Sequence, residues 1–70
     1  MDAGELRWQM WLHDSTIAAA AQGIGISERS MYNKLQGETE FTVSEAAKLA
    51  RLLHLGKDKR DEIFFGDGKE

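Results

Sequence analysis

Three residues, Gly25-Ile26-Ser27, constrain the fold of this chain more than any other feature. They separate two segments of helical character, 16–24 and 28–36, and leave almost no linker between them. Gly25 can adopt the left-handed backbone conformation that ends a helix, and Ser27 is a strong N-cap for the helix that follows. So short a joint forces the two helices to cross steeply. It therefore predicts a helix-turn-helix over residues 16–37.

The residues around this joint fit a close helix crossing. Ala21 is small enough to lie where the two backbones meet, and Ile26 supplies an apolar plug directly after the turn. In the second helix, Met31 and Leu35 are one turn apart and are expected to point inward. Gly37 then ends that helix.

Caps and 3.6-residue periodicity predict three further helices. The first begins at Asp2, with Glu5 as the expected capping-box partner, and runs to about residue 13. The next begins at Thr42 with Glu45 as its capping-box partner, and is expected to close at 55–56. A short last helix covers about residues 58–65. Because no segment alternates with a period of two, the sequence predicts an all-α fold of five helices that includes a helix-turn-helix.

Size and composition limit the class of protein. The 70 residues suffice for one small domain, expected over residues 1–65, with residues 66–70 expected to be a disordered tail. There is no cysteine to form disulfides or thiolate metal sites. No apolar run of about 18 residues is present, and the N-terminus lacks the order of a secretory signal. A cytoplasmic location without membrane association is the expectation.

The outward face of the helix at 28–36 carries groups that read DNA bases. On a helical wheel Arg29 and Asn33 lie opposite the inward pair, flanked by Glu28 and Tyr32. Arginine can contact guanine through two hydrogen bonds, asparagine can do the same with adenine, and glutamate accepts from cytosine. Taken alone, such a face is more often a solvated polar surface. The turn, the caps and the inward pair favour the DNA-reading interpretation.

The net charge of −3 argues against the DNA-reading interpretation, because DNA-binding proteins usually carry a basic surface. Residues 1–37 sum to −1, from three basic and four acidic side chains, and residues 38–70 sum to −2, from six basic and eight acidic ones. Neither half is basic. Any DNA-binding surface must therefore be local.

Residues 5–65 resemble the Cro/CI-type (XRE-family) helix-turn-helix domains of phage and bacterial repressors. The resemblance is strongest at Thr16, Ala21, 25–27, Met31 and Gly37, and the run MYNKLQGETEFTVSEAAKLARLLHL followed by DEIFF is similar to the phage-type branch found in Gram-positive bacteria. The resemblance implies a five-helix, lambda-repressor-like bundle. It also implies a repressor-like regulator that binds double-stranded operator DNA with a recognition helix at 28–35, commonly as a dimer.

Carried over residue by residue, the resemblance implies contacts to bases or nearby phosphates from Ser27, Glu28, Arg29 and Asn33. Base contacts are expected from Glu28, Arg29, Tyr32 and Asn33. Contacts to the DNA backbone are expected from Thr16, Ser27, Ser30, Lys34 and Gln36. Dimerisation in this family often uses the C-terminal helix, where Ile63, Phe64 and Phe65 are the candidates.

The chain departs from the family pattern in its core. Met10 and Leu35 stand where the family often has a buried arginine–glutamate pair, a replacement that can be neutral or stabilising. Ala20 stands where a leucine is usual and would leave a gap. We hypothesise that Trp8 or Trp11 fills it.

The chain also departs from the pattern on its surface. The segment after the helix at 28–36 is often basic in related repressors, whereas here it carries Glu38 and Glu40. Ile17 occupies a place where a polar phosphate-binding residue is common. Both changes lower the expected affinity for DNA.

An enzyme is not expected, and neither a cofactor nor a metal site is indicated. His13, Asp14 and Ser15 are consecutive and cannot converge as a triad built from separate elements, and His13 and His54 are isolated in the sequence. The main alternative is a protein-binding adaptor or antirepressor on the same fold. It would contact its partner through the two tryptophans of the first helix or through the acidic face.

Overall fold

The computed structural model describes residues 1–65 of the chain, which form five α-helices and no strand. The helices are α1 (Ala3–Leu12), α2 (Ile17–Ile24), α3 (Glu28–Gln36), α4 (Val43–Leu52) and α5 (Lys57–Phe65). This confirms the all-α, five-helix prediction. The expected tail at residues 66–70 lies outside the described residues. No helix in the described part is long and apolar enough to cross a membrane.

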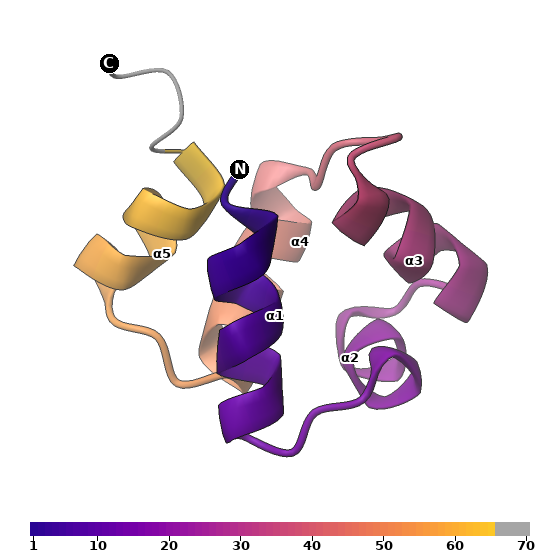
Figure 1. Ribbon diagram of the computed structural model, residues 1–70, viewed down its shortest axis with the longest axis horizontal. Coiled ribbons are helices and arrows are strands. Elements are labelled where there is room, and N and C mark those ends of the chain that lie inside the picture. Colours follow the sequence, from indigo (N-terminus) through magenta and orange to yellow (C-terminus); the bar gives the residue numbers. More distant parts are fainter. Residues whose placement is uncertain (66–70) are drawn as a thin grey trace.

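The helices pack around one core. Figure 1 shows α1 in front of α4, with α5 on one side and α3 on the other, while α2 lies beneath α3. The fully buried side chains at the centre come from different helices and include Leu6, Met31, Leu49, Leu53 and Ile63. Because α2 packs against both α3 and α4, it fixes the position of α3 relative to the rest of the bundle.

The ends of α2 and α3 agree with the sequence. Gly25 and Gly37 adopt left-handed backbone conformations with φ of 82° and 86°, as expected of glycines that follow a helix. At the end of α2 the N–H of Ile26 donates to the carbonyl of Ala21 at 2.9 Å, and at the end of α3 the N–H of Glu38 donates to Asn33 at 2.9 Å. Both helices therefore stop in Schellman-type turns.

The turns that end α1 and α4 contain no left-handed glycine. The left-handed residues there are Asp14, with φ of 55°, and His54, with φ of 57°. We expected α4 to close at 55–56, but the N–H of Leu55 already donates to the carbonyl of Ala50 at 2.8 Å, so the turn forms two residues earlier. A turn whose hydrogen bonds are all made can hold a non-glycine residue in this conformation despite its steric cost of about 1–2 kcal/mol.

The capping box expected at Asp2 forms only in part. The Asp2 carboxylate accepts the N–H of Glu5 at 3.1 Å, but the Asp2 N–H donates to the carbonyl of Ile63 in α5 at 2.7 Å. A tertiary contact to Ile63 therefore replaces the hydrogen bond that the Asp2 N–H would donate to the Glu5 side chain in a complete capping box. At α4 the complete box is present, with Thr42 and Glu45 each accepting the other's backbone N–H at 3.0 Å.

The hypothesis that a tryptophan fills the space beside Ala20 is wrong. Trp8 is 51% exposed and Trp11 68% exposed, and their rings stack on each other with centroids 5.1 Å apart. The core face of α1 is made by Leu6 and Met10 instead. Ala20 is itself fully buried. The helix at this position packs its backbone close to its neighbours rather than receiving a large side chain.

Candidate DNA-binding face on helix α3

The outward side of α3 carries the four residues expected to read bases, here called the α3 face: Glu28, Arg29, Tyr32 and Asn33. Glu28, Arg29 and Tyr32 are exposed, and Asn33 is half-buried. Met31 and Leu35, on the other side of the same helix, are buried in the core. The inward pair therefore fixes the rotation of α3 about its axis, as the sequence predicted.

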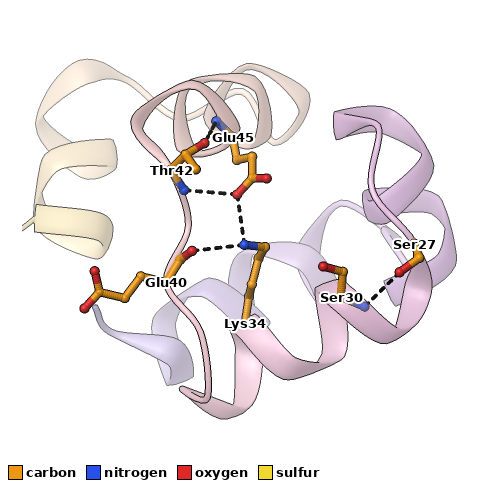
Figure 2. Close-up of polar contacts among 6 residues, drawn as sticks. All are labelled: Ser27, Ser30, Lys34, Glu40, Thr42 and Glu45. Carbon is orange, nitrogen blue, oxygen red and sulfur yellow. Dashed lines mark hydrogen bonds and ion pairs between the residues drawn. The ribbon is translucent and has the colours of Figure 1, made fainter.

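The N-terminus of α3 lies next to Glu28 and Arg29 of the α3 face. The Ser27 hydroxyl accepts the N–H of Ser30 at 3.0 Å, which caps the helix (Figure 2). The first amides of a helix, here those of Glu28 and Arg29, have no partner within the helix and form a site that favours anions. Within residues 1–65 Arg29 forms no ion pair, so its guanidinium is free to meet a ligand.

Two of the predicted backbone contacts lie at helix ends. Thr16 is exposed and caps α2, its hydroxyl accepting the N–H of Ala19 at 3.0 Å. Gln36 is exposed at the end of α3, where its side-chain carbonyl accepts from the guanidinium of Arg7 at 2.8 Å. Both keep polar atoms at the surface, Thr16 at the start of α2 and Gln36 at the end of α3.

Arg7 is a candidate that the sequence reasoning missed. It projects from α1 and is exposed, and its bond to Gln36 holds its positive charge beside the end of α3. The available signal was spacing: Arg7 lies one turn before Met10, and the family resemblance places Met10 opposite the end of the helix at 28–36. Arg7 and Arg29 together place two cations near the α3 face of an otherwise acidic chain.

The placement of Lys34 does not fit the predicted contact with the DNA backbone. Only 8% of the residue is exposed, and its ammonium donates to the carbonyl of Glu40 at 3.0 Å and pairs with the Glu45 carboxylate at 3.1 Å (Figure 2). The ammonium also lies 5.7 Å from the centre of the Phe41 ring. A cation with these internal partners would have to leave all of them to reach a phosphate. We therefore remove Lys34 from the contact set.

Two of the three residues expected to form a dimer interface are buried within the monomer. Ile63 is fully buried and Phe64 is 8% exposed, because both pack into the core from α5. Phe65 is 48% exposed and remains as the surface residue of the three. The hydrophobic end of α5 thus serves chiefly to complete the core.

The two histidines, which are isolated in the sequence, are neighbours in the fold. The rings of His13, which follows α1, and His54, which follows α4, have centroids 5.7 Å apart. Among the described residues no group of three or more potential metal ligands is assembled.

Comparison of the chain with protein-family models, with curated proteins and with solved structures finds no match.

Proposed function

We propose that this protein binds double-stranded DNA sequence-specifically as a transcription regulator and inserts α3 into the major groove. The α2–α3 pair acts as the helix-turn-helix, and the α3 face supplies the base contacts. The observation that carries the proposal is the free Arg29 guanidinium beside the capped start of a short helix whose other side is locked into the core.

The chemistry of the α3 face suits the edges of bases. Arg29 offers paired donors to guanine, Asn33 a donor and an acceptor to adenine, and Glu28 an acceptor to cytosine. Tyr32, 44% exposed, adds a hydroxyl and an aromatic surface. Ser27, Thr16 and the first amides of α3 provide neutral phosphate contacts, which hold a helix in register without requiring a basic chain.

The acidic charge of the chain sets the expected behaviour. With Arg7 and Arg29 as the cations near the α3 face, few counterions are released on binding. The dependence of affinity on salt should therefore be shallow, with about two ions released rather than the six to ten of strongly basic binders. Specific affinity must come mainly from hydrogen bonds and shape.

Selection of bound duplexes from a random pool, at low salt, tests the proposal. We expect enrichment of a short motif and binding of that motif in a direct titration. An Arg7→Ala variant serves as the control, because it should lower the salt dependence by about one ion and leave the selected motif unchanged. Failure of the wild-type protein to bind any duplex at about 50 mM salt would overturn the proposal.

A specific observation also favours a protein-binding role. Trp8, Trp11 and Leu12, here called the α1 face, are each about half exposed or more. Trp11 also lines a groove between α1 and the start of α2 with Met10 and Ile17. The hydroxyl oxygen of Ser15 in this groove is buried and has no hydrogen-bond partner among the described residues.

Exposed tryptophans beside a groove are typical anchors for a protein partner. An adaptor or antirepressor would use this surface and leave α3 in solvent. Substitution of Trp11 by serine separates the two functions. It should abolish binding to a protein partner and leave selection of DNA unchanged.

A further inference from the structure

Lys34 joins three parts of the molecule through one buried charge. It belongs to α3, its ammonium pairs with Glu45 in α4, and it binds the backbone carbonyl of Glu40 in the connection between the two helices. The side chains of Lys34 and Glu45 are only 10% and 19% exposed. An ammonium removed from water is tolerated only where it is paired and hydrogen-bonded, so these contacts fix its position.

The same contacts determine where the acidic connection lies. Figure 2 shows the backbone carbonyl of Glu40 turned toward Lys34, while the Glu40 carboxylate points away from Lys34 and from Ser27 and Ser30. The Oε1 atom of Glu45 accepts from both Lys34 and the backbone N–H of Thr42, so the end of the connection is tied to the same centre. The Phe41 ring packs beside the ammonium.

We propose that Lys34 is a positioning residue for the DNA-binding face: it holds the 37–42 connection so that the Glu40 carboxylate stays turned away from α3. This inference rests on the proposed function. A carboxylate repels a phosphate over distances up to a Debye length of about 8 Å at physiological salt. A connection released from Lys34 can bring Glu40 within that range of bound DNA.

The test is a double-mutant cycle with Lys34→Met and Glu40→Gln, measured on a duplex selected by the wild-type protein. Methionine keeps about the volume and the apolar stem of lysine. The Glu45 carboxylate then loses its ion pair and keeps the hydrogen bond from the Thr42 backbone, so the stability of the variant is measured alongside its binding. Glutamine keeps the Glu40 carbonyl that Lys34 binds and removes only the side-chain charge. Lys34→Met should weaken binding roughly three- to tenfold, the size expected of one partly screened charge.

The Glu40→Gln change should have little effect alone and should restore most of the lost affinity in the Lys34→Met background, which gives a coupling between the two sites. The salt dependence of Lys34→Met should not be shallower than that of wild type. A salt dependence lower by about one ion, with no rescue by Glu40→Gln, would make Lys34 a phosphate contact and overturn the proposal. Unchanged affinity in Lys34→Met would overturn it as well.

Urea unfolding of each variant checks that it is folded at the temperature of the binding assay. If Lys34→Met is unfolded there, Lys34→Gln replaces it, because this change also removes the ammonium that binds the Glu40 carbonyl and puts a shorter, neutral polar side chain in its place. The positioning role predicts weaker binding that Glu40→Gln rescues, whereas unchanged or tighter binding would overturn it. A wild-type protein that binds no duplex would instead refute the proposed function.

Discussion

Helices α1 and α3 each turn one side outward, and the two surfaces differ in kind. The α3 face consists of polar side chains with directional donors and acceptors, on a helix whose remaining side is buried. The α1 face presents two stacked tryptophans and a leucine, while Leu6 and Met10 on the opposite side already fill the core. Directional groups suit the reading of base edges, and apolar area suits a protein partner. The comparison separates two functions that the same fold could serve.

The largest expected effect is the loss of stability on truncating a buried apolar residue of α1, in contrast to the exposed tryptophans of the same helix. Leu6→Ala should lower the free energy of unfolding by about 2–5 kcal/mol, because it leaves a cavity at a fully buried position. Urea unfolding followed by circular dichroism measures the change. A cost below about 1 kcal/mol would mean that α1 contributes little to the core, and the division of α1 into a buried and an outward side would fail.

On the α3 face, Arg29→Ala should weaken binding to a selected site by about 1–3 kcal/mol and relax the preference at one base pair. The control is Lys57→Ala, which removes an equal charge from an exposed position at the start of α5, on the far side of the molecule from α3 (Figure 1). Competition with single-base variants of the site measures both quantities. Equal losses in the two variants would show that α3 contributes only charge.

On the α1 face, Trp8→Ser and Trp11→Ser should each cost about 1–2 kcal/mol of stability, less than Leu6→Ala, because about half of Trp8 and more of Trp11 is in water and the main loss is their mutual stacking. The measurement is the same urea unfolding, with Leu6→Ala as the buried counterpart. Neither change should alter DNA selection. A loss of several kcal/mol from either variant would place that ring in the core.

The smallest expected effect concerns the contacts that fix α3 to α4. The pKa of Glu45 is lowered, chiefly by the hydrogen bond from the Thr42 backbone and also by Lys34, with partial burial opposing the shift. The pKa of Glu45 is lower in the folded state than in the unfolded chain, where a glutamate titrates near pH 4.3. The ionised Glu45 carboxylate therefore adds stability at pH values above that of the unfolded chain. That stability is lost as the pH falls through the folded-state value.

Unfolding of wild type and Glu45→Gln at pH 7 and at pH 3 tests this sign. The variant should be less stable at pH 7, and the difference between the two proteins should shrink at pH 3. A difference that stays constant, or grows on acidification, would show that the Glu45 charge does not contribute to the contact between α3 and α4.

Local chemistry explains what could be predicted from the sequence alone. The caps at Thr16, Ser27 and Thr42 and the left-handed glycines Gly25 and Gly37 act within a few residues, so the bounds of α2 and α3 agree with expectation. The inward pair of α3 follows from helical periodicity alone. These features also determined which residues form the α3 face, because burial of one side of a short helix exposes the other.

The tertiary structure decided what depends on contacts between distant segments. The sequence made Trp8 and Trp11 candidates for the core, and only packing against α3 and α5 selected Leu6 and Met10 instead and left the two tryptophans outside. Lys34 looks like a surface cation in sequence, and its burial depends on Glu40 and Glu45, which meet it only after α3 and α4 pack. Caps and turns are set by neighbours along the chain, whereas burial and charge pairing are set by neighbours in space. For this reason the sequence determined α2, α3, the turn at 25–27 and the α3 face, whereas the fold determined the α1 face and the burial of Lys34.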